Sequence, residues 1–420
     1  AVKSSGNLTV TANGGAIEIG KTAAATVAAG ENAHDPDPAV ESTVSLGATK
    51  YVNVGVGSKV LATKDVAITA GGNVNMHGAV EAKGTATLQA TGAGKSVKVG
   101  NGTDAASVTG AKVALEGGLS AQVQDNSTVT ATGADGVSMK GAGYVLVDAN
   151  ASVSAANGAV ALTANDGEAA VPAELISKAG VQVTGAVEGK SVTATAKKGS
   201  ILVDANGSVK ATDGVATLSA TGAQDGQGVR INGEVTGKTG VTVGSGRDVE
   251  IAGAKAKVLA GEVSVADPTA TAAQDGVSLS VTAAKDVLVA GGAKVASSGS
   301  ADLTATAGDL TVNGGSQVGA AKGLTATAGG AFEVSGNSAV AAKETATVSA
   351  GAVYVQGGTL ESGKKMTVTA SDGNVIVKDG KIGSGDAVSV TAAKGDVHVG
   401  GFDAGTPPTE VAGKVQGVNA

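Results

Sequence analysis

The chain has 420 residues, a formal net charge of −7 and no cysteine, which excludes disulfides and thiolate metal sites. It has 67 Gly but only 3 Tyr, 2 Phe and no Trp, so its core has to consist of small aliphatic side chains. The positive charges are scattered and come mostly from Lys, which argues against nucleic-acid recognition, and no apolar run approaches the roughly 18 residues of a membrane span.

A five-residue alternating phrase that ends in Ala recurs along the chain and predicts short β-strands. Examples are LTVTA at 8–12, VAITA at 66–70, VTATA at 192–196, LTATA at 303–307 and LTATA at 324–328. The last residues of the final five phrases, at 307, 328, 350, 370 and 392, are 20 to 22 residues apart. A second strand and often a shorter third strand follow each phrase, so the sequence has a three-strand repeat of roughly 21 residues.

The alternation predicts which side chains face inward. In the phrase at 303–307, we expect Leu303, Ala305 and Ala307 on one apolar face. Thr304 and Thr306 then share the outer face.

Two folds can hold three short strands in each repeat. Antiparallel hairpins would suit the many Asn-Gly and Asp-Gly pairs, but hairpins do not require equivalent strands at a fixed period. Stacked coils do, because each strand pairs with its equivalent in the next coil. We therefore predict an all-β protein with one elongated, continuous parallel β-solenoid over residues 1–420, built of about 18 coils.

All six prolines lie in segments that fail the period, and proline cannot donate to a strand ladder. These segments predict loops that leave the corners of the coil. They lie at 22–50 (a loop or hairpin), 165–180, 266–276 and 402–410.

Chemistry-bearing residues are sparse. Asp35 and Asp37 form the densest acidic pair, beside His34, but a metal site needs more ligands at a defined spacing. His77 and His398 lie far from His34 and from each other in the sequence. We expect no catalytic, cofactor-binding or metal-binding residue, no cofactor and no enzymatic activity. A polysaccharide-active β-helix enzyme stays an alternative.

Outward Thr-x-Thr pairs favour another alternative, an ice-binding solenoid. These pairs are Thr9/Thr11, Thr304/Thr306, Thr325/Thr327 and Thr367/Thr369, and in a solenoid they would stack into two columns. Thr is also common on any exposed strand face, and Ser or Gln interrupts the array in several repeats.

The phrase GNLTVTANGGAIEIG at 6–20 resembles the filamentous-haemagglutinin repeats of bacterial two-partner-secretion exoproteins, as do KDVAITAGGNVNMHG at 64–78 and GDLTVNGGSQV at 308–318. The resemblance implies a right-handed parallel β-helix outside the outer membrane, secreted or at the cell surface, acting as a stiff stalk or adhesin. The Asn-Pro-Asn motifs of that family's secretion domain are missing, so the domain is absent from this chain or export uses another route.

The first strand begins at about Leu8 without a capping segment, and an uncovered coil is an open sheet edge. We therefore expect copies of the chain to stack end to end into a homopolymer, as a structural filament of a biofilm or cell surface. The alternative is a fragment of a large secreted adhesin without self-assembly. A host or neighbouring-cell surface is the other expected partner, without nucleic-acid binding or membrane insertion.

Overall fold

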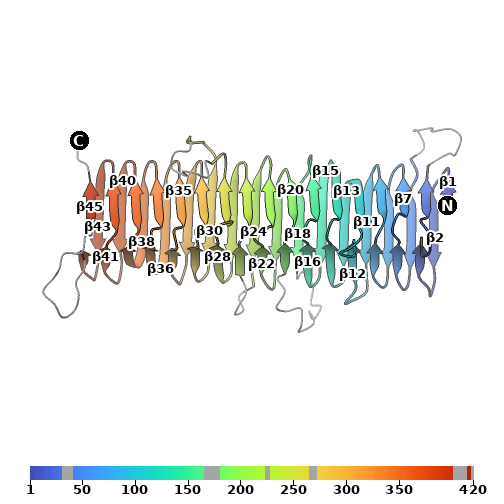
Figure 1. Cartoon of the computed structure of the whole chain (residues 1–420), viewed down its shortest axis with the longest axis horizontal. Coiled ribbons are helices and arrows are strands. Elements are labelled where there is room, and N and C mark those ends of the chain that lie inside the picture. Colours follow the sequence, from blue (N-terminus) through green and yellow to red (C-terminus); the bar gives the residue numbers. More distant parts are fainter. Residues whose placement is uncertain (31–40, 165–179, 223–227, 264–271, 401–413, 418–420) are drawn as a thin grey trace. The chain divides into compact units, whose positions relative to one another are not determined.

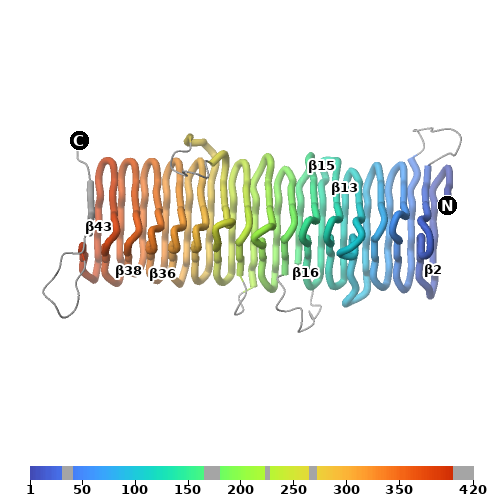
Figure 2. Tube along the Cα trace, in the orientation of Figure 1, coloured from blue at the N-terminus to red at the C-terminus, as the bar shows by residue number. Residues whose placement is uncertain are grey.

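The computed structural model describes residues 1–30, 41–164, 180–222, 228–263, 272–400 and 414–417. These residues form two compact units, unit 1 over residues 1–213 and unit 2 over residues 214–420. Within each unit the strands stack in parallel, turn upon turn (Figures 1 and 2). The predicted all-β parallel solenoid is confirmed, and the antiparallel-hairpin alternative is wrong. No helix among the described residues is long and apolar enough to cross a membrane.

Each turn of unit 1 contributes one strand to each of three faces, which we name A, B and C. Face A holds β2 (Leu8–Ala12), β5 (Val44–Ala48), β8 (Val66–Ala70), β11 (Thr85–Ala90), the second halves of β13 (Ser107–Gly117) and β15 (Thr128–Gly141), β18 (Val160–Ala164) and β21 (Val192–Ala196). Face B holds β3 (Ile17–Ile19), β6 (Val52–Val54), β9 (Val74–Met76), β12 (Ser96–Val99), β14 (Ser120–Val123), β16 (Tyr144–Val147), β19 (Val181–Val183) and β22 (Ile201–Val203). Face C holds β1 (Val2–Ser4), β4 (Thr26–Ala29), β7 (Lys59–Ala62), β10 (Ala79–Ala82), the first halves of β13 and β15, β17 (Ser152–Ala155), β20 (Ala186–Gly189) and β23 (Ser208–Ala211).

Unit 2 repeats the same three faces. Face A holds β24 (Val215–Ala220), β27 (Gly240–Ser245), β30 (Ser278–Ala283), β33 (Ser300–Ala305), the first halves of β36 (Leu324–Ser335) and β38 (Ala346–Gln356), β40 (Lys365–Ala370) and β43 (Ala387–Ala392). Face B holds β25 (Gly228–Ile231), β28 (Asp248–Ala252), β31 (Val287–Ala290), β34 (Leu310–Val312), the second halves of β36 and β38, β41 (Val375–Lys378) and β44 (Val397–Val399). Face C holds β26 (Glu234–Gly237), β29 (Lys257–Ala260), β32 (Lys294–Ser297), β35 (Gln317–Ala320), β37 (Ala339–Ala342), β39 (Thr359–Ser362), β42 (Lys381–Ser384) and β45 (Lys414–Gly417).

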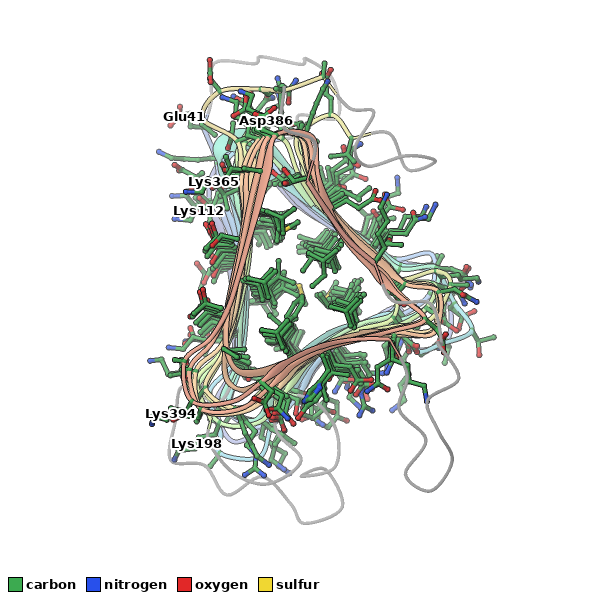
Figure 3. All side chains as sticks on the ribbon, turned by 90° about the vertical axis from the view of Figure 1, so that its left-hand side faces the viewer. Glu41, Lys112, Lys198, Lys365, Asp386 and Lys394 are labelled. Carbon is green, nitrogen blue, oxygen red and sulfur yellow. The ribbon has the colours of Figure 1, made fainter. Side chains whose placement is uncertain are left out.

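The core of each unit is a set of apolar columns inside the turns, which enclose a triangular interior (Figure 3). Every second residue of a strand points inward, so equivalent residues of successive turns stack on one another. Leu303 is 1% exposed and Val312 is fully buried. Phe332 of β36 is the largest fully buried side chain among the described residues, and Val, Leu, Ile and Ala fill nearly all other inward positions.

The corners between faces B and C of unit 2 show why the chain uses Gly and Asn there. Gly314 and Gly315 have φ of 65° and 76°, and in the next turn Gly336 and Asn337 have φ of 61° and 60°. This left-handed conformation is strained for most residues but open to Gly and tolerated by Asn. The stacked corners are joined by a hydrogen bond from the Gly315 N–H to the Gly336 carbonyl oxygen, 2.9 Å long.

Two sequence predictions on the coils need correction. The described strands form about 16 turns, not about 18, because some turns are much longer than 21 residues: Gly240 and Ser278 are in register although they lie 38 residues apart. The predicted insertion at 22–50 was too wide. Its residues 26–29 form β4 and its residues 44–48 form β5, and both strands belong to the ladders of unit 1.

The register of the phrase at 303–307 also needs correction. Ala305, and not Ala307, pairs with Ala328, and Ala301 begins the buried row of β33. Ala307 and Thr306 are exposed beyond the end of the strand. The error arose because a shift of two residues preserves the inward and outward alternation, so the pattern alone cannot distinguish the two registers.

The other predicted insertions lie largely outside the described residues. This holds for 165–179, 266–271 and 402–410. The described end of the third insertion is attached to unit 2, because the Gln274 N–H donates to the Ser298 carbonyl oxygen at 2.7 Å and Ser298 Oγ donates to Gln274 Oε1 at 2.6 Å. The prediction of one continuous solenoid over 1–420 stays a prediction, since each unit is described by itself.

Candidate functional site

Of the histidines and acids that the sequence singled out, only His77 and His398 lie among the described residues. His34, Asp35 and Asp37 lie outside the described residues. His77 directly follows β9 in unit 1, whereas His398 lies in β44 of unit 2. Among the described residues, no three His, Asp or Glu side chains are placed to hold a metal ion.

The outward hydroxyls are concentrated on face A of unit 2. Two columns of outward side chains run through its eight strands, and 14 of their 16 positions are Thr or Ser. The exceptions are Asp302 and Gly244. Thr304 and Thr327 are neighbours in one column, but Thr325 faces Asp302, so the predicted Thr304/Thr306 pair does not join the array as a pair.

A second polar surface lies on face B of unit 1 and was not predicted. We name it the face B polar surface. Its side chains form two columns that cross successive turns: Tyr51, Asn73, Ser96, Ser120 and Tyr144 in the first, and Glu18, Asn53, Asn75, Lys98 and Gln122 in the second. Two of the three tyrosines of the chain therefore lie on one face of one unit.

Side chains of the face B polar surface bond to one another across turns. Asn75 Nδ2 donates to Asn53 Oδ1 at 2.7 Å. Tyr51 Oη donates to Glu18 Oε1 at 2.9 Å, and Glu18 Oε2 is paired with Lys21 Nζ at 2.8 Å. These bonds hold the amides, the phenol and the carboxylate in defined positions relative to one another.

The same network continues further along face B. Ser120 Oγ donates to Ser96 Oγ at 2.7 Å. Gln122 Nε2 donates to Ser120 Oγ and to Tyr144 Oη, both at 2.7 Å. Ser120 is fully buried and Gln122 is only 4% exposed, so this end of the surface is a fixed structural network.

The exposed end of the face B polar surface contains two grooves that share Asn53. The Tyr51 groove has a volume of about 510 Å³ and is lined by Thr49, Lys50, Tyr51, Asn53, Gly71, Gly72, Asn73, Asn75 and Lys95. The His77 groove has a volume of about 430 Å³ and is lined by Glu18, Ile19, Gly20, Lys21, Thr22, Ala23, Ala24, Asn53, Gly55, Val56, His77 and Asn101.

Backbone forms the floor of the Tyr51 groove. A Cβ on Gly72 would overlap the carbonyl oxygen of Lys50, and a Cβ on Gly71 would overlap the carbonyl oxygen of Thr49. The turns therefore pack closely here only because glycine has no side chain. The walls of the groove consist mainly of the side chains of Tyr51, of three asparagines and of two lysines: Asn53, Asn73, Asn75, Lys50 and Lys95.

Local charges shift the pKa values at the edge of this surface. The hydrogen bond from Lys21, followed by the one from Tyr51, holds the pKa of Glu18 below its ordinary value. The same bond to the Glu18 carboxylate raises the pKa of Tyr51. Glu18 is thus ionised and Tyr51 is neutral around pH 7, so the phenol O–H is the hydrogen-bond donor and the carboxylate is the acceptor.

A comparison of repeats would have revealed part of this surface. The segments YVNV at 51–54 and NVNM at 73–76 both place Asn at the outward position of the second strand, one turn apart. The phrase that ends in Ala forms the strands of face A, whereas face B has no equally regular outward pattern.

The fold and this surface define the chain as a parallel β-solenoid protein that presents a polar groove on one face. Comparison with known protein families, with characterised proteins and with solved structures finds no match for this chain.

Proposed function

We propose that this chain is a structural β-solenoid of a bacterial surface, acting outside the cell as a stiff fibre or adhesin stalk. The observation that carries the proposal is the residue-for-residue register of equivalent strands within each unit, with an apolar column inside every face. Backbone hydrogen bonds between turns then run along the stack, and the side chains inside it leave no space for bending between turns.

Ion pairs between neighbouring turns support the same role. Lys210 Nζ lies 3.4 Å from Glu188 Oε1 in unit 1, and Lys381 Nζ lies 2.7 Å from Glu361 Oε1 in unit 2. Lys210 and Glu188 are directly opposed in adjacent turns, whereas Lys381 and Glu361 are diagonal neighbours in adjacent turns. Exposed pairs add little individually, but they keep like charges from stacking on one another. The resemblance of the repeats to filamentous-haemagglutinin repeats favours the extracellular location.

Surface labelling tests the proposal. Antibodies raised against the purified chain are applied to intact and to permeabilised cells of the bacterium that makes it. We expect equal labelling of both preparations. Labelling only after permeabilisation would contradict the extracellular role.

End-to-end stacking of copies into a filament is part of this proposal. It predicts that the sedimentation coefficient of the purified chain rises with protein concentration. A constant coefficient over a wide range would favour the stalk of a larger adhesin over a self-assembling filament.

Ice binding is a second candidate function, and the hydroxyl columns on face A of unit 2 favour it. Thr and Ser occupy 14 of 16 column positions there but only 9 of the 16 equivalent positions in unit 1, so the array is specific to one unit. Hydroxyls recur at roughly 4.8 Å across strands and roughly 6.8 Å along them, which is a regular lattice for ordered water. Thermal hysteresis of the purified chain measures this activity directly.

A further inference from the structure

We propose that the Tyr51 groove of unit 1 binds a polysaccharide that carries carboxylate groups, with Lys50 and Lys95 as the charge-recognising residues. This goes beyond the structural role proposed above and does not depend on it. The inference rests on the charges, the amides and the shape of the groove.

The lining of the groove carries positive charge, and the nearby carboxylate of Glu18 is paired with Lys21. Lys50 and Lys95 line it and are exposed, and no Asp or Glu is among the described residues that line it. Lys98 is the next outward residue after Ser96 in β12. It is in register with Asn75 of the preceding turn and with Gln122 of the following turn. Two ammonium groups therefore line a groove whose other polar side chains are neutral, and Lys98 lies on the same face.

At two other lysines of unit 1, the neighbouring turn supplies a carboxylate. Lys140 faces Glu116 in register and lies 3.8 Å from it, and Lys210 faces Glu188 in register. At Lys98 the in-register neighbours are amides. A ligand carboxylate would take the place that Glu116 and Glu188 take beside those two lysines, which is why we assign carboxylates to the ligand.

The neutral groups of the groove suit a sugar. The bond between Asn75 Nδ2 and Asn53 Oδ1 leaves the NH₂ of Asn53 and the carbonyl oxygen of Asn75 for sugar hydroxyls. The Tyr51 ring offers an apolar face, and its hydroxyl is held by Glu18, so the ring is fixed. Fixed amides and a fixed ring bind with a small loss of side-chain entropy.

The shape of the groove suits a polymer. Tyr51, Asn73 and Ser96 occupy the same column in three successive turns, roughly 4.8 Å apart. Lys50 and Lys95 border the first and third of these turns, so their backbones are separated by two turn spacings. A chain of several acidic sugars lying along the stack would reach both lysines and would pass over the glycine floor between them.

Binding of the full-length chain to polygalacturonate, measured by isothermal titration calorimetry at low ionic strength, tests the inference. The test variant is Lys50→Gln with Lys95→Gln. The control variant, Lys190→Gln with Lys198→Gln, removes the same charge from two exposed lysines of unit 1 outside the groove; Lys198 lies at a corner of the turns in Figure 3. Melting temperatures of both variants show that they are folded.

We expect polygalacturonate to bind the unmodified chain and the control variant equally. The test variant should bind roughly fivefold more weakly. Each exposed ion pair contributes modestly, and the variant loses two of them. The isosteric change Asn75→Asp should also weaken binding, since it places a negative charge beside the ligand carboxylates. Neutral dextran should not bind.

Several results would overturn the inference. They are equal binding by the test variant and the unmodified chain, binding of dextran as tight as that of polygalacturonate, and no binding of polygalacturonate at all. Preferential binding of dextran sulfate or of single-stranded DNA would reject the carboxylate-bearing sugar as the ligand. None of these results bears on whether the chain is a surface fibre, which the labelling experiment decides.

Discussion

The Tyr51 hydroxyl donates a hydrogen bond to the Glu18 carboxylate across one turn of face B, with 2.9 Å between Tyr51 Oη and Glu18 Oε1. Together with the stronger contribution of Lys21, this bond lowers the pKa of Glu18 from its ordinary value of 4.5. A carboxyl group with a lowered pKa stabilises the fold above its unfolded pKa, and that contribution is lost as the pH falls through the lowered value.

The first prediction concerns this pair. Tyr51→Phe should raise the pKa of Glu18 towards its ordinary value but leave it below that value, because the Lys21 contact remains. The carboxyl carbon shift of Glu18, followed by NMR from pH 7 to pH 2, measures it. Glu18 is exposed, so melting temperatures should barely change. An unchanged Glu18 pKa would mean that the bond does not persist in solution.

The second prediction tests the inward and outward assignment in unit 2. Leu303→Asp places a charge in the core without a partner and should destabilise the fold by about 3–5 kcal/mol. Thr304→Lys, one residue further on the outer face, should change stability by less than about 0.5 kcal/mol. Urea unfolding of both variants makes the comparison, and equal effects would reject the assignment.

The third prediction concerns the one large ring in the described core. Phe332 is 1% exposed and lies in register between Leu310 and Val353. Phe332→Ala should cost about 3–5 kcal/mol, because the neighbouring turns are held by their own ladders and cannot collapse into the cavity. Phe332→Leu is the control and should cost much less. A small loss in the Ala variant would indicate that the interior repacks freely.

The fourth prediction concerns glycine at the groove floor. Gly72→Ala should destabilise unit 1 by about 1–3 kcal/mol, because the new Cβ overlaps the carbonyl oxygen of Lys50 and the turns must separate. Gly47→Ala is the matched control, since a Cβ there meets nothing within 4 Å and the backbone conformation is not left-handed. It should be neutral or slightly stabilising in thermal unfolding. If Gly72→Ala melts like Gly47→Ala, the turns are not closely packed at this corner.

The fifth prediction separates the two proposed functions. A structural fibre should show no thermal hysteresis. If the unmodified chain does show it, lysine at Thr304, Thr325, Thr327 and Thr347 should abolish it, because these residues form adjacent parts of both hydroxyl columns. Lysine at Thr193 and Thr195 in unit 1 serves as the control. Hysteresis that survives the four changes would exclude this face as the ice-binding surface.

Much of the fold followed from the sequence alone. The recurring five-residue phrases, the alternation within them and the near-constant spacing require equivalent strands to stack, and stacked equivalents are parallel. The small side chains of the inward positions followed from the shortage of aromatic residues. These features depend on residues close together in the chain, so a sequence pattern records them directly.

The tertiary structure alone decided register and the candidate site. Alternation has a period of two, so Ala305 and Ala307 were equivalent by pattern, and only pairing with Ala328 selected Ala305. The number of residues in each turn varies as well. The segment at 22–50 therefore broke the expected period, although it contains β4 and β5, which pair within the ladders of unit 1. The Tyr51 groove joins Lys50 to Lys95, which are 45 residues apart in the sequence. Their proximity is set by how many residues each intervening turn uses, and that number is a property of the packed corners rather than of any local pattern.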